Sequence, residues 1–171
     1  MTNMLIASED YEICYSQPDD APFLKGWIQD PNMLQWYPAS SEQDIEFFVR
    51  NWIGFSRYQA SLTALYKGQP IGIATLFLMP YLKVAHTSMT YMLVDPAYQR
   101  RGVGSSLLKN IVHHAKARFR LEFTYLEVYE GSPILPLLNK SDFYEVFRQE
   151  NFVRQGELSR ARIIMEKQLI A

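Results

Sequence analysis

The sequence predicts a single α+β domain over residues 1–171, with a mixed, mostly antiparallel sheet flanked by helices. Three observations favour this class. Apolar residues follow a strand-like pattern in successive segments between residues 61 and 94, and they recur at helical spacing in three other segments. A strand, a helix and another strand then follow each other between residues 85 and 129, which implies at least one parallel strand pair. No linker or internal repeat divides the chain.

The first half of the chain predicts a short strand followed by helices. Residues 11–16 are short and β-prone, and the Pro and Asp residues after them open a helix that Pro31 stops. One side of that helix carries Phe23, Leu24, Trp27 and Ile28. Ser40, with Gln43 three residues later, predicts a capping box before a second amphipathic helix. Its apolar side carries Ile45, Phe48, Val49, Trp52 and Ile53.

The loop between these two helices is aromatic. Trp36 and Tyr37 lie in it, and the sequence leaves two interpretations open for them. They either form a lid over an active site or simply pack against the rest of the domain.

The second half predicts most of the sheet. Residues 61–67 and 71–78 form a hairpin signal around the turn Lys-Gly-Gln-Pro, and residues 85–94 offer a third antiparallel strand. Residues 104–118 form the clearest helix, with Leu107, Leu108, Ile111, Val112 and Ala115 on one face. A strand at 123–129, a short helix at 141–149 and a last strand at 160–169 complete the prediction.

Composition limits the possible functions. The chain is 48% hydrophobic and 20% charged, with a formal net charge of −1, so neither disorder nor general attraction to nucleic acid is indicated. Cys14 is the only cysteine, which excludes an internal disulfide and is most simply a small buried apolar group. His113 and His114 point about 100° apart on a helix, so they form no chelating pair and no metal site is predicted.

The sequence also bears on location. The N-terminal stretch "MTNMLIASEDYE" lacks the charge order of a signal peptide. The longest apolar run is about a dozen residues, whereas a membrane-spanning helix needs about 20. We therefore expect a soluble, cytoplasmic protein without a membrane partner.

The stretch Gln99 to Gly104, "QRRGVG", carries the strongest chemical signal. A strand that passes through Gly102 and Gly104 into a helix leaves unpaired N–H groups at the helix N-terminus, which is a phosphate-binding arrangement. Arg100, Arg101 and Ser105 add charge and a hydroxyl donor, and no acidic residue occurs between Tyr98 and Ala117. The pattern favours a pyrophosphate ligand, with a plain tight turn flanked by solvated arginines as the alternative.

Two common nucleotide motifs do not fit this stretch. A nucleotide P-loop requires Lys after its second glycine, where this chain has Ser105. The dinucleotide fingerprint requires a third glycine three residues further on, where Leu107 stands. Hydrolysis of ATP or GTP and binding of NAD or FAD are therefore not indicated.

At these residues the chain resembles the GNAT family of N-acetyltransferases. The acetyl-CoA motif of that family runs Gln or Arg, two residues, Gly, one residue, then Gly or Ala, and Gln99, Gly102 and Gly104 match it. The preceding "YMLVDPAYQ", the later "YLEV" and "FRQENF", and the order of elements also agree. The resemblance implies acetyl-CoA as cosubstrate, held at the turn by Gln99, Arg100, Arg101, Gly102, Val103, Gly104 and Ser105, and by Asn139 from a later loop.

The resemblance further implies two parallel strands that splay apart to admit the pantetheine arm of CoA. The backbone of Leu93 and Val94 would bond that arm, and the Leu93 amide would polarise the thioester carbonyl. Acetyl transfer would then be direct and would need no covalent intermediate, which agrees with a sole cysteine far from these motifs.

The resemblance suggests Glu127 as the general base, on a strand face that it shares with Tyr125 and Tyr129. A solvated glutamate without a catalytic role is the alternative. Other family members use a glutamate one strand earlier, where this chain has Ser88.

The general acid is the clearest departure from the family. Phe147 stands where a tyrosine often protonates the departing thiolate, and Phe has no proton to give. Tyr144, one turn earlier on the expected helix, would be the substitute, or it would be a packing residue. A thiol with a pKa near 8.5 could also leave unassisted.

The function indicated is therefore acetyl transfer from acetyl-CoA to a primary amine of a small molecule, peptide or protein, by a monomer or homodimer. A non-catalytic acyl-CoA-binding or regulatory domain is the alternative. Aromatic residues near Trp36 favour an apolar or peptide-like amine, whereas the acidic residues of the early helices favour a polyamine. These acidic residues are Asp30, Glu42, Asp44 and Glu46. Two arginines on a nearly neutral chain give too few phosphate contacts for nucleic acid.

Overall fold

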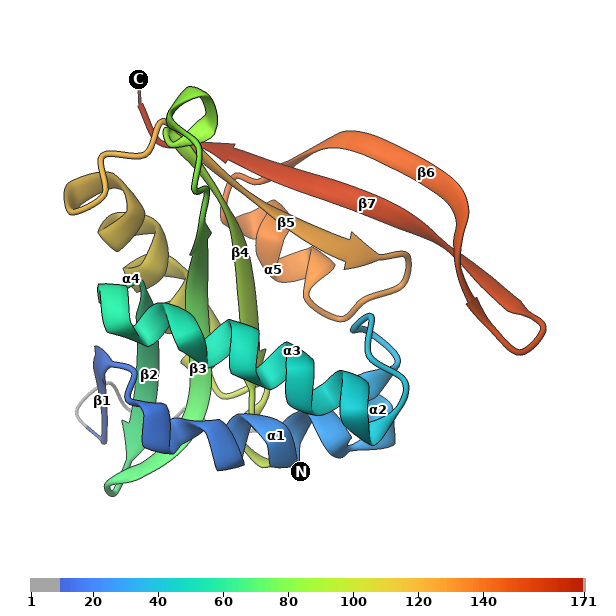
Figure 1. Ribbon diagram of the computed structural model, residues 1–171, viewed down its shortest axis with the longest axis horizontal. Helices are drawn as coiled ribbons and strands as arrows, with labels where there is room; N and C mark the ends of the chain where they lie inside the picture. Colours follow the sequence, from blue (N-terminus) through green and yellow to red (C-terminus); the bar gives the residue numbers. More distant parts are fainter. Residues whose placement is uncertain (1–9, 171) are drawn as a thin grey trace.

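A computed structural model describes residues 10–170. The N-terminal residues 1–9, which belong to the stretch without the charge order of a signal peptide, lie outside this range. The described chain forms a seven-stranded sheet in the order β1-β2-β3-β4-β5-β7-β6 (Figure 1). β4 and β5 are parallel, and every other neighbouring pair is antiparallel. The α+β class with a mixed sheet is therefore confirmed.

The strands and helices have the following bounds. The strands are β1 (Tyr11–Tyr15), β2 (Ser61–Tyr66), β3 (Gln69–Leu78), β4 (Thr87–Val94), β5 (Phe123–Tyr129), β6 (Tyr144–Gln155) and β7 (Leu158–Gln168). The α-helices are α1 (Ala21–Gln29), α2 (Pro31–Leu34), α3 (Glu42–Gly54), α4 (Val103–Ala117) and α5 (Leu135–Lys140). None of the helices within residues 10–170 combines the length and the apolar character needed to cross a lipid bilayer.

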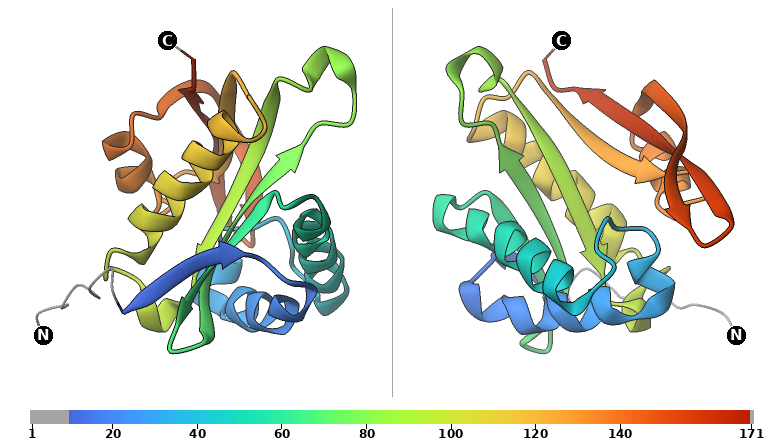
Figure 2. Two further views of the ribbon diagram at one scale, coloured as in Figure 1. Left: turned by 90° about the vertical axis from the view of Figure 1, so that its left-hand side faces the viewer. Right: turned by 45° about the vertical axis from the view of Figure 1, so that its right-hand side comes forward.

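Two hydrophobic clusters hold the layers together, one on each face of the sheet. One packs α4 and α5 against the sheet and includes the fully buried Leu107, Ile111 and Leu138. The other packs α1 and α3 on the opposite face and includes Trp52 and Leu93. Figure 2 shows α4 on one side of the sheet and the α1–α3 layer on the other.

The predicted N-terminal helices form, with small differences at their ends. Pro31 ends α1 as predicted, but it is also the first residue of the short helix α2, whose N-cap is Asp30. The capping box of α3 pairs Ser41 with Asp44, and not Ser40 with Gln43. Ser40 also donates to the Asp44 carboxylate, so the neighbouring serines share one acceptor and the cap lies one residue later than expected.

The parallel pair β4–β5 is short. Only three pairs are in register, Thr87 with Phe123, Ser88 with Thr124 and Met89 with Tyr125. The buried hydroxyls of Ser88 and Thr90 lie 3.0 Å and 2.7 Å from that of Thr124, so side-chain hydrogen bonds tie the strands together where the ladder ends. Beyond this point the strands separate, and the second half of β4 has no partner on its β5 side.

The C-terminal region corrects the prediction. The expected helix at 141–149 is absent, and β6 starts at Tyr144 and forms a long hairpin with β7 that extends away from the body (Figure 1). A short helix, α5, occurs instead in the segment around Asn139, where the sequence predicts a loop. β6 is a mostly exposed edge strand with two register shifts, which remove the alternation that would have identified it.

Candidate active site

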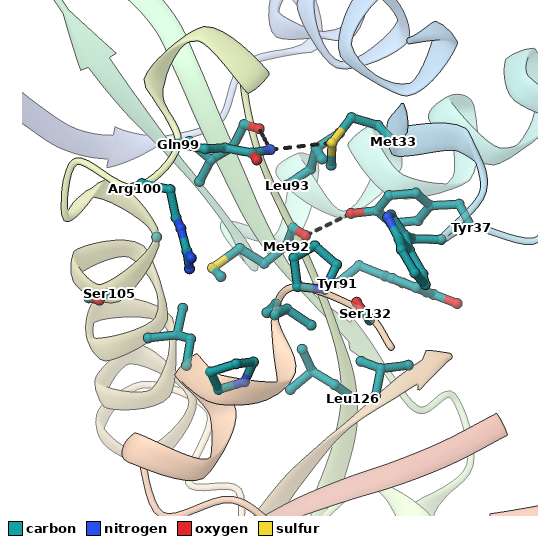
Figure 3. Close-up of a pocket in the computed structure, with 18 of the residues that line it drawn as sticks. Met33, Tyr37, Tyr91, Met92, Leu93, Gln99, Arg100, Ser105, Leu126 and Ser132 are labelled. Carbon is teal, nitrogen blue, oxygen red and sulfur yellow. Dashed lines mark hydrogen bonds between the residues drawn. The ribbon is translucent and has the colours of Figure 1, made fainter. Parts of the chain in front are cut away.

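A cavity of about 470 Å³ opens where β4 and β5 separate (Figure 3). The ends of both strands form two of its sides, and the turn before α4, the segment around α5 and the loop after α2 form the others. Residues of five segments therefore meet at a single site. The lining includes Gln99, Arg100, Gly102, Gly104 and Ser105 of the predicted turn, together with Leu93, Val94 and Glu127.

In β4, the backbone N–H and C=O groups that point away from β3 toward the cavity are those of Met92 and Val94. Asp95 N donates to Ile71 O, directly opposite on β3. Because hydrogen-bonded pairs alternate along antiparallel strands, the N–H and C=O of Leu93 face Ile73 of β3. The groups of Met92 and Val94 therefore face the cavity side.

Two hydrogen bonds agree with this orientation. Tyr37 donates from its hydroxyl to Met92 O at 3.0 Å, and the Gln99 side-chain amide donates to Val94 O at 2.9 Å (Figure 3). The Leu93 amide therefore faces β3 and not the cavity, contrary to the expectation from the sequence. The Leu93 side chain is buried among α1 and α3.

The turn before α4 has the backbone that the sequence predicts for an anion site. Gly102 is the N-cap of α4 with φ 91°, a conformation that favours glycine, and Arg100 also has a positive φ of 61°. Such a non-glycine residue is uncommon in structures and occurs often at functional sites. No capping side chain satisfies the first N–H groups of α4, so they are available to a ligand.

Gly104 lies in the first turn of α4, close to the opposite wall of the cavity. A Cβ atom at this position would lie 3.6 Å from Leu137 Cδ2 and 3.7 Å from Val94 Cγ2. A single methyl group would fit at ordinary contact distance, whereas a larger side chain would enter the cavity.

Three of the predicted cofactor residues do not line the cavity. Val103 is buried in the core under α4, and Arg101 lies over the Tyr98 ring at 5.6 Å. Asn139 is exposed on α5, while its neighbours Leu137 and Lys140 face the cavity. Only the main chain of Val103 therefore remains part of the candidate phosphate site.

Glu127 lies on β5 at the other end of the cavity, with 23% of its side chain exposed. Burial raises the pKa of its carboxyl group, and the nearby guanidinium of Arg162 on β7 opposes this rise. Arg162 Nη1 lies 3.5 Å from Glu127 Oε2. Burial raises the pKa of Tyr125 and Tyr129, and the Glu127 charge adds to this rise, consistent with the shared face predicted for these residues.

Tyr144 lies apart from the cavity. It is 46% exposed, and its hydroxyl donates to Glu166 Oε1 at 3.1 Å on the neighbouring strand. Since residues 144–149 are a strand, the helical face that would have aligned Tyr144 with Phe147 does not exist. The structure does not bring Tyr144 together with the other predicted site residues.

The aromatic loop after α2 forms one wall of the cavity through Trp36 and Tyr37. Tyr37 also packs against Trp52 and Tyr91, and burial raises the pKa of its hydroxyl. Tyr37 is thus both a packing residue and a cavity residue. Trp36 carries the guanidinium of Arg160 on its ring, 4.6 Å from the centroid.

The acidic residues considered for a polyamine site are engaged elsewhere. Glu42 and Glu46 both pair with Lys25, at 3.1 Å and 3.0 Å. Asp30 and Asp44 cap α2 and α3. None of the four lines the cavity, so these acidic residues do not favour a polyamine as the acceptor.

Sequence reasoning missed Arg160 and Arg162. The two arginines stand two residues apart on the last strand, a spacing that places them on one face, but nothing in the sequence indicates that this face borders Glu127. Within residues 10–170, no group of His, Cys, Asp and Glu side chains is arranged to hold a metal ion.

Comparisons with known proteins identify the family. A sequence model of the Acetyltransferase (GNAT) family matches residues 10–134, and no curated protein sequence matches the chain. A GNAT-family acetyltransferase from Streptococcus pneumoniae superposes with a TM-score of 0.73 at 20% identity, covering 92% of this chain and 98% of the other.

Two further solved structures share the fold. A ribosomal-protein-alanine N-acetyltransferase from Brucella melitensis gives a TM-score of 0.75 at 20% identity, covering 92% of this chain and 99% of the other. A putative acetyltransferase from Salmonella typhimurium, solved with its cofactor acetyl-CoA, gives 0.77 at 15% identity, covering 94% and 95%. These likenesses concern the fold, while the match over residues 10–134 shows that the chain belongs to the Acetyltransferase (GNAT) family.

Proposed function

We propose that this acetyltransferase binds acetyl-CoA in the cavity between β4 and β5 and moves the acetyl group directly to a primary amine. One observation carries the proposal. The same cavity is bordered by the turn before α4, by the main chain of Met92 and Val94, which has no strand partner on this side, and by the half-buried carboxylate of Glu127. A site for a pyrophosphate, a site for amide groups and a candidate base thus border one cavity.

The turn before α4 would hold the pyrophosphate of CoA. The free N–H groups from Gly102 to Ser105 and the positive end of the α4 dipole favour a negative charge there. Arg100 borders the same space and adds a guanidinium (Figure 3). The Gln99 side chain does not need to contact the ligand, since its amide donates to Val94 O and so holds the turn against β4.

The open edge of β4 would hold the pantetheine arm and the thioester. The N–H groups of Met92 and Val94 face the cavity side, and each carbonyl can accept a second hydrogen bond beside the one that it already has. We assign the Met92 N–H to the thioester carbonyl, where it would stabilise the oxyanion that develops in the transition state.

Glu127 would accept the proton of the amine, directly or through water. The neutral amine attacks the thioester carbonyl carbon, its nitrogen passes one proton to Glu127 as the tetrahedral intermediate forms, and the C–S bond then breaks to give the amide and release CoA as a thiolate. A carboxylate whose pKa is raised by burial is a better base at neutral pH than a solvated one.

No protein group is assigned to protonate the thiolate. Tyr144 is turned toward Glu166, and Phe147 has no acidic proton. A thiolate whose conjugate acid has a pKa of about 8.5 is a tolerable leaving group near neutral pH. Its departure without a general acid is therefore the mechanism that these residues support.

The absence of a tyrosine at Phe147 also supports a second candidate, a non-catalytic acyl-CoA-binding domain. A CoA-release assay over a panel of amines separates the two. We expect steady release of CoA with at least one amine. Thermal stabilisation by acetyl-CoA without turnover on any amine would favour the binding domain.

A further inference from the structure

We propose that the acceptor is an amine that carries a carboxylate on the adjacent carbon, as in a free α-amino acid. This inference rests on the proposed acetyl transfer and specifies its substrate. It starts from two guanidinium groups, those of Arg160 and Arg162, which lie beside the candidate base and for which the mechanism has no use.

Arg160 and Arg162 belong to the same face of the sheet as Glu127. Tyr129 lies opposite Arg162 and Glu127 lies opposite Ile164 in the β5–β7 register. Residues that face each other across paired strands share a face, and so do alternate residues along one strand. Both arginines therefore lie on the Glu127 side, on the hairpin that runs past β5 in Figure 1.

Both arginines contact residues that line the cavity. Arg162 Nη1 lies 3.5 Å from the Glu127 carboxylate, and Arg160 lies over the Trp36 ring. Neither arginine lines the cavity itself, but each contacts a residue that does, and we take this border of the cavity, next to Trp36 and Glu127, as its rim.

The charge of this rim is positive. Arg160 has no carboxylate partner among the described residues, and the only hydrogen bond of its side chain there goes from Nη2 to the neutral side chain of Gln35. Arg162 pairs with Glu127 and donates to Gln149, while its buried Nε has no hydrogen-bond partner among the described residues.

Three further carboxylates, those of Glu130, Glu145 and Glu150, surround the single guanidinium of Arg148 and make that cluster net negative. Arg148 lies opposite Ile163 and Glu145 opposite Met165, so Arg148 and Glu145 belong to the other face of the sheet from Arg160 and Arg162. Two guanidinium groups and one carboxylate therefore leave about one positive charge beside the base, which favours an acceptor with a negative group.

The spacing selects the position of that negative group. An ammonium group bound by Glu127 would lie within a few ångströms of a carboxylate bound by Arg162, because Arg162 itself contacts Glu127. Arg160 stands two residues along the same strand face, about 7 Å from Arg162. A carboxylate on the carbon next to the amine satisfies this spacing, and guanidinium groups bind carboxylates with strong, charge-assisted hydrogen bonds. The acceptor side chain would then face the aromatic residues Trp36 and Tyr91.

The test compares three matched series of acceptors in the CoA-release assay: free L-amino acids, their carboxamides, and the amines that lack the carboxyl group. The α-amine of a carboxamide is less basic, so more of it is uncharged near neutral pH and simple reactivity favours it. We expect kcat/KM of the preferred amino acid to exceed that of its carboxamide by about 10- to 100-fold.

Variants of Arg160 test whether this residue causes the preference for the acid over the carboxamide. Arg160→Gln should reduce the ratio of kcat/KM between acid and carboxamide by about tenfold, and Arg160→Lys should retain part of the preference because the charge remains. Arg154→Gln is the matched control, since Arg154 is exposed on the same hairpin and its neighbour Val153 is the residue opposite Arg160. This control should keep the wild-type ratio.

Two outcomes would overturn the inference. If carboxamides or decarboxylated amines are acetylated as efficiently as the acids, the enzyme does not recognise the carboxylate. The release of CoA in that assay would still support the acetyltransferase proposal. An equal loss for acid and carboxamide in Arg160→Gln would show that Arg160 supports the fold of the site and not the carboxylate. No CoA release in any series would contradict the acetyl transfer itself.

Discussion

The guanidinium of Arg162 lies 3.5 Å from the carboxylate of Glu127, although the two residues are 35 positions apart in the chain. The rings of Phe147 and Phe152 hold this guanidinium, with their centroids 5.7 Å and 4.2 Å from Arg162 Cζ. Phe152 lies in the register shift of β6 between Gln149 and Val153. The irregular edge strand therefore positions the charge that acts on the candidate base.

Replacing Arg162 by Gln should raise the pKa of Glu127, because burial continues to raise this pKa and the guanidinium that opposes it is gone. A base works in its deprotonated form. The acidic limb of the kcat/KM profile should therefore move to higher pH, measured with an amine that lacks a carboxylate. If the acidic limb does not shift, or shifts to lower pH, Glu127 is not the group that removes the proton from the amine.

Replacing Gly104 by Val should weaken acetyl-CoA binding by about 100-fold or more, because the γ-methyl groups would occupy the cavity between Val94 and Leu137. Gly104→Ala is the control. Its Cβ meets only ordinary contacts, and Ala in a helix is favoured over Gly by about 0.5–1 kcal/mol. Calorimetric titration measures both, and tight binding by Gly104→Val would place the cofactor elsewhere.

Gly72 on β3 should tolerate no side chain. A Cβ atom there would lie 2.8 Å from Leu107 Cδ1 and 3.3 Å from the Leu93 carbonyl oxygen. We expect Gly72→Ala to lower the free energy of unfolding by about 1–3 kcal/mol.

Gly26 provides the comparison for Gly72. It is exposed in α1 with no atom within 4 Å of its Cβ position, so Gly26→Ala should stabilise the protein by about 0.5–1 kcal/mol. Urea unfolding measures both variants. Equal effects would show that α4 does not pack closely on β3.

The sequence predicted most elements because their patterns are local. The face of α4 formed by Leu107, Leu108 and Ile111 is buried as its spacing indicates, and β5 has the predicted bounds. β6 was missed since an exposed edge strand buries neither face and its register shifts interrupt the period of two. The predicted N-cap of α3 lies one residue before the observed one because Ser40 and Ser41 both suit that position.

The site was predictable only where a motif is contiguous. Gln99 to Gly104 lie in one stretch, and four of its residues line the cavity as a group. The free main-chain groups of β4 depend on the hydrogen bond between Asp95 and Ile71, which the sequence does not specify, so Leu93 was chosen in place of Met92. Arg160 and Arg162 reach the site through the pairing of β7 with β5, which is a property of the whole sheet.

The steady-state rate of CoA release by Glu127→Gln, compared with the wild type at saturating acetyl-CoA and neutral pH, tests the central claim most directly. Gln keeps the shape of the side chain and removes the proton acceptor. The rate should fall by about 10²- to 10⁴-fold, while the Kd for acetyl-CoA stays within about twofold of the wild-type value. Turnover equal to the wild type would contradict a mechanism in which Glu127 accepts the amine proton.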